Sequence, residues 1–209
     1  MPPEKNNTKK TQILQLATSL NNKLAVRSIA ASSRVVKEKI GDSFVYAPLG
    51  RELSYFKRWG AKIIKEVKIK DINNSKAVIK RLKTIINEHN IEIIHSHDFN
   101  SLKIAQALQK LLDVRVLYTK TEDFLENSLF KFLNDAVFGE PLIHHNTIVP
   151  TKLTYNKLLT KYARKGAVLN LIPIPVDFSV YSENKVSQER TISLTRSWGM
   201  LEKPRFIVL

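Results

Sequence analysis

The chain has 209 residues, of which 43% are hydrophobic and 25% are charged, and it contains no cysteine. This composition is typical of a soluble globular protein whose core forms without disulfides. The absence of cysteine excludes thiolate zinc sites and a cysteine nucleophile. The net charge is +15, and the first 90 residues account for +12 of it, so we expect an anionic partner or surface for the N-terminal half.

The first ten residues, MPPEKNNTKK, are polar and basic, and no signal-peptide-like apolar stretch follows them. No apolar run approaches the ~20 residues of a membrane-spanning helix. We therefore expect a disordered basic tail over residues 1–10. The protein is expected to be cytoplasmic, with peripheral association at the inner face of the membrane as an option that its charge leaves open.

Short apolar runs alternate with longer segments along the rest of the chain. The short runs predict strands at residues 11–17, 43–50, 61–67, 91–98, 114–121, 142–149 and 167–173. The longer segments have helical spacing and predict helices at residues 22–39, 51–60, 73–90, 101–112, 122–138 and 151–162. Gly41 is interpreted as the C-cap of the first helix. A further helix is expected at residues 187–198 and a final strand at 206–209.

Strands of about six residues alternating with helices of about twelve are typical of βαβ units. Several strands are apolar at nearly every position, as expected where helices cover both faces of a sheet. The sequence therefore predicts the α/β class, with a single doubly wound parallel-sheet (Rossmann-like) domain over residues 11–177. Residues 178–209 are expected to form a linker helix and a strand that lacks neighbours within the chain.

Two histidines and an aspartate end the predicted strand in IIHSHD. At the carboxyl end of a parallel strand they would lie where ligands bind. His95 and His97 are two residues apart and point to one side. A zinc site needs a further ligand, and His144 and His145 face opposite sides, so no metal site is predicted. We interpret one histidine of the first pair as packed beneath the edge and the other as facing the cleft. Asp98 is either a cleft residue or the N-cap of the next helix.

The connection from the first strand to the first helix, ATSLNN, contains no glycine. Asn21 and Asn22 can adopt left-handed backbone conformations, but a side chain keeps their backbone farther from a phosphate than glycine would. Neither a P-loop nor a GxGxxG motif is present. Dinucleotide binding is therefore not expected, and no cofactor is predicted.

Lys76, Lys80 and Lys83 form a cationic stripe opposite the apolar face of the helix predicted at 73–90. The stripe is interpreted as a solvated face or as a contact for anionic lipid headgroups or a phosphorylated acceptor. No aromatic residues are interleaved with the lysines and no nucleic-acid motif is present, so nucleic acid is not a predicted partner. The helix predicted at 122–138 is rich in Phe and Leu, and tight burial is favoured over an exposed apolar edge.

The stretch LNLIPIPVDFSVYSE, residues 169–183, resembles the inter-domain boundary of family 4 retaining glycosyltransferases. In that family a strand is followed by Ile-Pro-x-x-Val-Asp and then an aromatic residue, and the matching positions here are Ile172, Pro173, Val176, Asp177 and Tyr181. An Ile-Pro pair replaces the usual Asn-Gly or Arg-Gly. Three further stretches resemble family segments and occur in the same order along the chain: QILQLATSLN, IEIIHSHDFNS and NTIVPTKLTYNKLLTKY. KVSQERTISLTRSWGMLEKPRFIVL resembles the linker helix and the first strand of the second domain.

The resemblance implies a GT-B fold, in which two Rossmann-like domains face each other across a cleft. The groups that bind the donor diphosphate belong to the second domain, so none is assigned here and no catalytic residue is predicted. Asn21-Asn22 or their neighbours stand where the family has Gly-Gly, and Thr121 stands near the place of a histidine close to the reacting sugar. The acceptor-side cleft candidates are Asn21, Asn22, His95, His97, Asp98 and Thr121.

The chain is thus expected to be the acceptor-side domain of an enzyme that moves a sugar from a nucleotide-sugar to a lipid-linked or lipopolysaccharide-type glycan. Without the donor-binding domain it is expected to be inactive alone. Either a separately encoded donor-binding domain is its partner, or the chain is a remnant of a broken gene. The alternative is a noncatalytic domain that binds an anionic membrane or another partner through its basic half.

Overall fold

The computed structural model describes residues 10–64, 75–121, 146–162, 168–174 and 187–197. The chain divides into two units, residues 1–174 and 175–209, which are described separately. Several predicted features lie outside the described residues: most of the basic tail, the Phe-rich helix at 122–138, His144, His145 and the last strand at 206–209.

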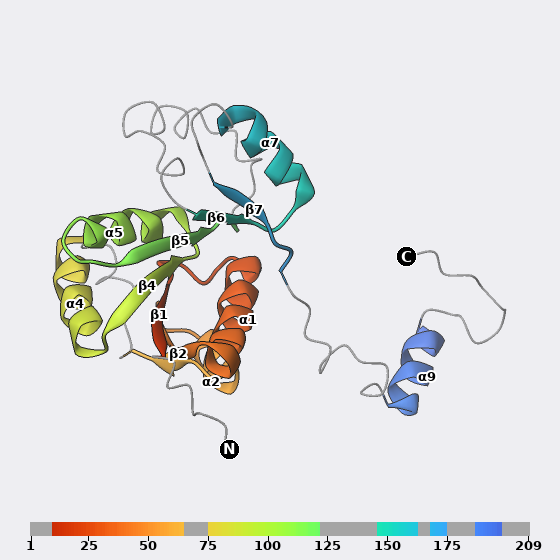
Figure 1. Cartoon of the computed structure of the whole chain (residues 1–209). Coiled ribbons are helices and arrows are strands. Elements are labelled where there is room, and N and C mark those ends of the chain that lie inside the picture. Colours follow the sequence, from red (N-terminus) through yellow and green to blue (C-terminus); the bar gives the residue numbers. More distant parts are fainter. Residues whose placement is uncertain (1–9, 65–74, 122–145, 163–167, 175–186, 198–209) are drawn as a thin grey trace, which may run out of the picture. The chain divides into compact units, whose positions relative to one another are not determined.

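Within the described part of the first unit, seven strands form one all-parallel sheet (Figure 1). The strands are β1 (Thr11–Leu16), β2 (Gly41–Tyr46), β3 (Lys62–Ile63), β4 (Ile91–Ser96), β5 (Arg115–Thr119), β6 (Asn146–Val149) and β7 (Leu169–Leu171). Their order across the sheet is β3-β2-β1-β4-β5-β6-β7. Such a sheet runs outward in both directions from its centre, which is the doubly wound arrangement.

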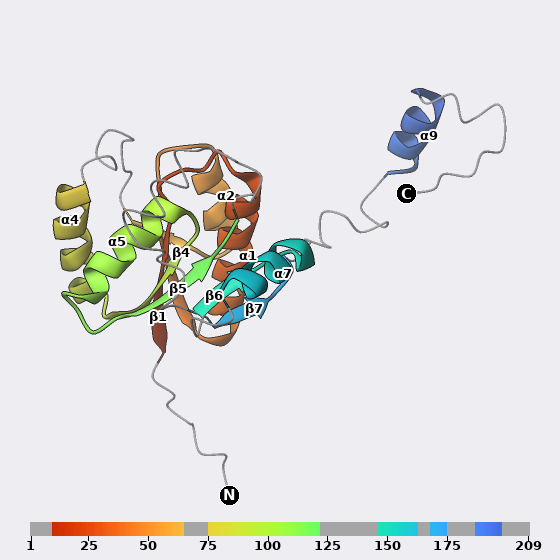
Figure 2. The same ribbon diagram turned by 90° about the horizontal axis from the view of Figure 1, so that it is seen from above.

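Helices connect the strands and cover both faces of the sheet. The first unit has α1 (Lys23–Lys39), α2 (Glu52–Arg58), α4 (Ser75–Glu88), α5 (Phe99–Gln109) and α7 (Lys152–Tyr162). Figure 2 shows the central strands between α1 and α2 on one side and α4 and α5 on the other. The second unit contains α9 (Gln188–Ser197). None of the helices in the described ranges is both long enough and apolar enough to cross a bilayer. The predicted α/β class is confirmed.

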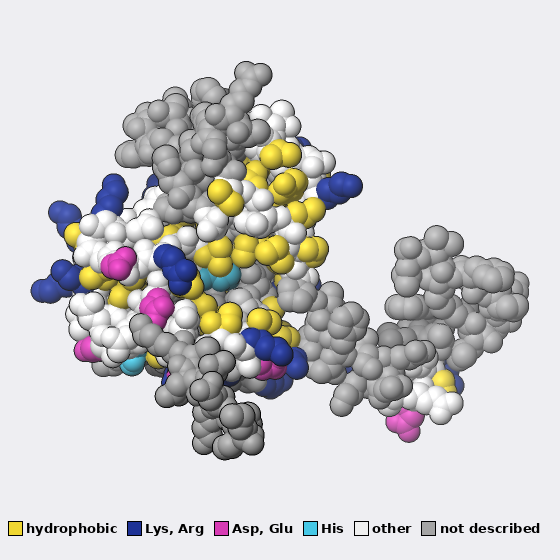
Figure 3. All heavy atoms as spheres, in the orientation of Figure 1, with side chains coloured by type: hydrophobic (Ala, Val, Ile, Leu, Met, Phe, Trp, Pro, Cys, Tyr) yellow, Lys and Arg dark blue, Asp and Glu magenta, His cyan; other side chains and the backbone are white. Residues whose placement is uncertain are grey.

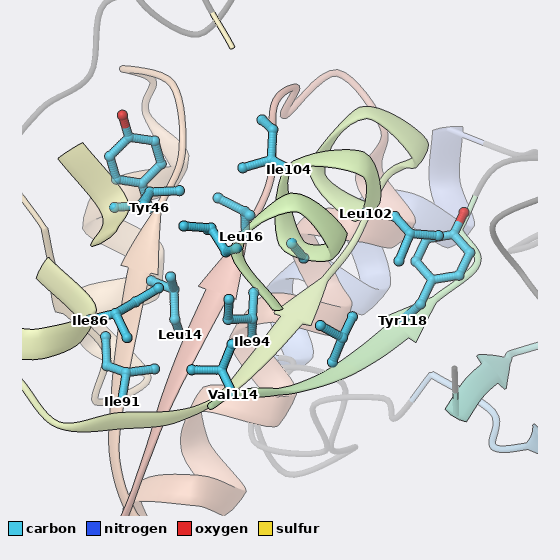
Figure 4. Packing of buried hydrophobic residues seen from close by; sticks show 14 of the residues in the cluster. Leu14, Leu16, Tyr46, Ile86, Ile91, Ile94, Leu102, Ile104, Val114 and Tyr118 are labelled. Carbon is cyan, nitrogen blue, oxygen red and sulfur yellow. The ribbon is translucent and has the colours of Figure 1, made fainter. Parts of the chain in front are cut away.

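Two hydrophobic clusters hold the layers together, one on each face of the sheet. The larger cluster packs strand residues against α4, α5 and α7, and its fully buried members include Leu14, Ile94, Leu82, Leu102, Leu108 and Leu158. Figure 4 shows members of this cluster on the central strands and on α4 and α5. The smaller cluster packs the other face against α1 and α2 through Val45, Ile29 and Phe56. Strands with large apolar side chains on both faces need cover on both sides, which explains the runs read from the sequence.

Gly41 is not the C-cap of the first helix. Ile40 is the C-cap of α1, and Gly41 is the first residue of β2, where it pairs with Thr11 of β1. A Cβ atom at this position would collide with the backbone carbonyl oxygen of Thr11, so only glycine fits. Glycine is needed here because β1 and β2 approach each other closely, which cannot be read from the local sequence.

Candidate functional site

The order of the strands reverses between β1 and β4, which are hydrogen-bonded neighbours at the centre of the sheet. From β1 the chain proceeds outward to β2 and β3, and from β4 it proceeds outward to β5, β6 and β7. The loops that follow β1 and β4 consequently diverge at their carboxyl ends, which is where open α/β sheets bind ligands. Every predicted cleft residue lies in β4 or in a segment directly after β1, β4 or β5.

Asp98 connects the two sides of this switch point. Its Oδ2 accepts a hydrogen bond from the Thr18 N–H (2.6 Å), and its Oδ1 accepts bonds from the Thr18 hydroxyl and the Ser101 N–H (both 2.7 Å). The bond to Ser101 belongs to a capping box at the start of α5. The capping role considered for Asp98 is confirmed, although the helix begins at Phe99 rather than near Ser101. The same carboxylate also fixes the loop that follows β1.

Asn22 and Thr121 link the loop after β1 to the end of β5. The Asn22 side chain caps α1 by accepting a hydrogen bond from the Leu24 N–H (2.8 Å), and its Nδ2 donates to the Thr121 carbonyl (2.9 Å). The Thr121 hydroxyl donates to the backbone carbonyl of His97 (2.8 Å). The carboxyl ends of β1, β4 and β5 are thus joined through side chains.

Asn21 differs from its neighbour because its side chain is exposed. Neither Asn21 nor Asn22 uses the left-handed conformation considered from the sequence. Among non-glycine residues of the described ranges, only Asn90 has a positive φ, and Asn22 is extended at φ −83°. Asn21 is therefore a cleft candidate whose side chain is available to a ligand, whereas Asn22 is occupied as a helix cap.

His95 and His97 lie side by side, with ring centroids 4.1 Å apart, and both are buried. The expectation that one of them faces the cleft is therefore wrong. His95 Nε2 is 2.7 Å from the Thr119 hydroxyl, and His97 Nε2 is 2.7 Å from Oε1 of Gln15 in β1. With the Gln15 carbonyl oxygen as the acceptor, Nε2 of His97 is the donor of this bond. Its Nδ1 is buried and has no hydrogen-bond partner within the described part of the chain.

Burial keeps both histidines neutral. Burial lowers the pKa of His95 to about 3, because the protein interior solvates an imidazolium poorly. Burial also lowers the pKa of His97 well below its usual value, and the neighbouring His95 adds to the effect. No cluster of three or more metal-ligating side chains occurs within the described ranges. The two neutral imidazoles lie beneath the carboxyl edge of the sheet, where they hold the side chains of Thr119 and Gln15 in place.

Sequence reasoning missed Gln15, Thr18 and Thr119, although each is a partner of a predicted residue. Gln15 is completely buried in β1 and also contacts the Ser32 hydroxyl of α1 at 3.2 Å. A glutamine between the apolar residues Leu14 and Leu16 is the signal that could have pointed to a polar partner across the sheet. Thr18 and Thr119 stand in segments where threonine is common, so nothing in the sequence distinguishes them.

The three lysines of the predicted cationic stripe lie on α4, in an element separate from the carboxyl-edge cluster. Lys76, Lys80 and Lys83 are all exposed, while the apolar side of α4 is buried in the larger cluster. In Figure 3 basic side chains gather on the left flank of the molecule, where α4 and α5 lie. The amphipathic pattern read from the sequence is thus present in the structure.

Comparison with known proteins supports the fold. No protein-family model matches the chain, and no curated protein matches it in sequence. Among solved structures it is similar to a glycosyltransferase from Rickettsia africae, with a TM-score of 0.65 and 14% identity over 92% of this chain. The chain spans 50% of the length of that glycosyltransferase. Its single all-parallel α/β domain therefore has a glycosyltransferase-like fold.

Two other solved structures are more distant. Sucrose-phosphate synthase from Thermosynechococcus elongatus has a TM-score of 0.49 and 11% identity, covering 91% of this chain and 97% of that one. MurG from Acinetobacter baumannii has a TM-score of 0.39 and 10% identity, covering 83% of this chain and 71% of that one.

Replacing Asp98 should destabilise the protein, because three hydrogen bonds to its carboxylate are lost. We expect Asp98→Ala to lower the free energy of unfolding by roughly 2–4 kcal/mol, since a helix cap and charged hydrogen bonds are removed together. Urea denaturation measures the change. The matched control is Asp113→Ala, which removes an exposed carboxylate. Equal losses in the two variants would contradict the bridging role of Asp98.

The buried histidines should make stability depend on pH. An unfolded histidine takes up a proton near pH 6.5, whereas His95 does so only at about 3, so the unfolded state binds more protons as the pH falls. The stability contributed by neutral His95 should therefore decrease below pH 6.5 by about 1.4 kcal/mol per pH unit. Urea denaturation between pH 6.5 and 4.5 tests this. His95→Gln should flatten the slope and the exposed control His89→Gln should not; an unchanged slope in His95→Gln would refute the assignment.

Proposed function

We propose that residues 11–177 are the acceptor-side domain of a family 4-like retaining glycosyltransferase. In intact form the enzyme would move a sugar from a nucleotide-sugar to a lipid-linked or lipopolysaccharide-type glycan. The observation that supports this most strongly is the match of nearly the whole chain to half of a glycosyltransferase. The order of the family-like segments along the sequence adds independent support. Under this proposal, residues 178–209 lead into the donor-binding domain.

The carboxyl edge supplies the acceptor side of the proposed cleft. Its exposed candidate is Asn21, whose amide can donate to and accept from sugar hydroxyls. Asn22, Asp98 and Thr121 would act indirectly, since their hydrogen bonds fix the loops on which an acceptor would rest. His95 and His97 would support the same loops from beneath. This division of roles follows from which side chains are exposed and which are already bonded.

The chemistry of transfer would come from a second domain. Stabilisation of the leaving diphosphate is a large part of the catalysis expected for such a reaction, and the resemblance assigns it to basic residues of the donor-binding domain. Thr121 stands near the place of the family histidine, and a threonine supplies no imidazole there. Its hydroxyl is bonded to the His97 carbonyl. We therefore propose that this domain transfers no sugar by itself and that a donor-binding domain completes the cleft. The site of action would be the cytoplasmic side of the membrane.

The proposal is tested by separating acceptor binding from transfer. We expect the purified chain to release no nucleoside diphosphate from UDP- or GDP-sugars, but to bind a lipopolysaccharide-core oligosaccharide in saturation-transfer NMR. Asn21→Ala should weaken binding by about tenfold, as expected for the loss of ligand hydrogen bonds. The control Asn87→Ala removes an exposed asparagine from α4. Transfer by the chain alone, or equal binding by the two variants, would contradict the proposal.

A second candidate function is noncatalytic attachment to an anionic membrane. It is favoured by one observation, the exposure of Lys76, Lys80 and Lys83 on a helix whose opposite face is buried in the core. An ammonium group near an anionic bilayer is attracted electrostatically, and several on one face add up. This surface would be compatible with the first function, since a lipid-linked acceptor also lies at a membrane.

Membrane attachment predicts that binding depends on these three lysines. Each contributes about 1 kcal/mol, so replacing all three by Gln should lower partitioning onto phosphatidylglycerol vesicles by about two orders of magnitude. Co-sedimentation with vesicles measures the effect, and pure phosphatidylcholine vesicles should bind neither protein. Replacing Lys57, Lys110 and Lys157, which are exposed elsewhere, removes the same charge. If that control loses as much binding, net charge rather than the α4 surface is responsible.

A further inference from the structure

A groove of about 590 Å³ lies on the flank of the sheet between β2, β3 and the second half of α4. Its lining includes Phe44, Lys62, Ile64, Arg81, Thr84 and Ile85. Its volume falls within the roughly 300–1,000 Å³ typical of small-molecule pockets. Because α4 returns the chain from the carboxyl edge to the start of β4, its second half lies toward the amino ends of the strands. The groove is therefore distinct from the site formed by Asn22, Asp98 and Thr121 at the carboxyl ends of the strands.

The floor of the groove is apolar and well supported. Phe44, Ile64 and Ile85 belong to the larger hydrophobic cluster and are each less than 10% exposed. The His89 imidazole stacks on the Phe44 ring, with centroids 4.6 Å apart and planes 29° apart. A floor formed by core residues is rigid, so the surface it presents does not need to be ordered when a ligand binds.

Two cations stand beside this floor in different situations. The Lys62 ammonium lies 5.4 Å from the Phe44 ring centre and is bonded to Asp42 at 2.8 Å. The Arg81 guanidinium lies 5.9 Å from the Tyr46 ring, and no carboxylate within the described part of the chain pairs with it. Arg81 is thus a forked donor of five N–H bonds beside an apolar floor.

We infer that this groove binds a small amphiphilic anion, with the apolar body against Phe44, Ile64 and Ile85 and the acidic group on Arg81. A purely apolar ligand would leave the guanidinium without a partner, and a purely ionic one would leave the floor exposed to water. A carboxylate or sulfonate on an aromatic or short acyl body satisfies both surfaces. Glu88 at the rim disfavours ligands with several negative charges.

Binding of two matched fluorescent probes to the full chain tests the inference. The anion 8-anilinonaphthalene-1-sulfonate and the uncharged N-phenyl-1-naphthylamine share an aromatic body and differ in the sulfonate. Arg81→Gln should weaken binding of the sulfonate about tenfold and leave the uncharged probe within about twofold of wild type. Arg81→Lys, which keeps the charge, should retain most of the sulfonate affinity. Decanoate should displace the sulfonate probe and inorganic phosphate should not.

Two further variants locate the binding and control for charge. Thr84→Trp places an indole over the groove from an exposed position of α4 and should weaken both probes. Lys83→Gln removes one charge from the outer face of the same helix and should change neither. Wild-type binding by Thr84→Trp, or equal losses of sulfonate binding in Arg81→Gln and Lys83→Gln, would overturn the inference. If circular dichroism shows that Arg81→Gln does not fold, the inference is tested by the other two variants. Retained sulfonate binding in Arg81→Lys together with weakened binding in Thr84→Trp would support it.

Discussion

A buried carboxylate is tolerated only when its oxygens are hydrogen-bonded, and Asp98 meets this requirement by bridging two elements that are 80 residues apart in the chain. The Thr18 N–H and hydroxyl approach it from the loop after β1, and the first turn of α5 approaches it from the other side. Neither loop could move far without leaving donors or acceptors unpaired. The geometry of the switch point depends on this one group.

The other polar residues at the edge extend the same constraint. Thr121 bonds to the backbone carbonyl of His97, and Asn22 bonds to the carbonyl of Thr121, so the ends of three strands form a continuous network. Beneath them His97 contacts Gln15 and His95 contacts Thr119, and both rings stay neutral because they are buried. The edge is therefore built to hold loops in place and to present an exposed residue such as Asn21. The proposed acceptor-side role needs a surface of this kind.

The basic side chains of the N-terminal half differ in their surroundings. Lys37 and Lys62 both bond to Asp42 and lower its pKa, so these two charges stabilise the local fold. The lysine stripe of α4 is exposed and faces away from the core. Arg81 is half-buried, lies over the Tyr46 ring and lines the flank groove. Similar residues on adjacent turns of one helix thus differ in role because the core fixes which side of the helix is buried.

Apolar periodicity was sufficient to predict the alternation of strands and helices, the parallel sheet and the apolar face of α4, because these features depend on neighbouring residues. It also placed His95, His97 and Asp98 at the end of a strand. It did not predict that Gly41 begins β2, because the reason is the Thr11 carbonyl of another strand. It did not predict that both histidines are buried, since their cover comes from residues distant in sequence.

The sequence by itself therefore determined the class of fold and the segments that meet at the carboxyl edge. Only the tertiary structure decided which of those side chains are exposed, which are bonded and which are neutral. The physical reason is that hydrophobic patterning is a local property of the chain, whereas burial and hydrogen bonding at Asp98, His97 and Thr121 depend on groups brought together by the packing of separate strands.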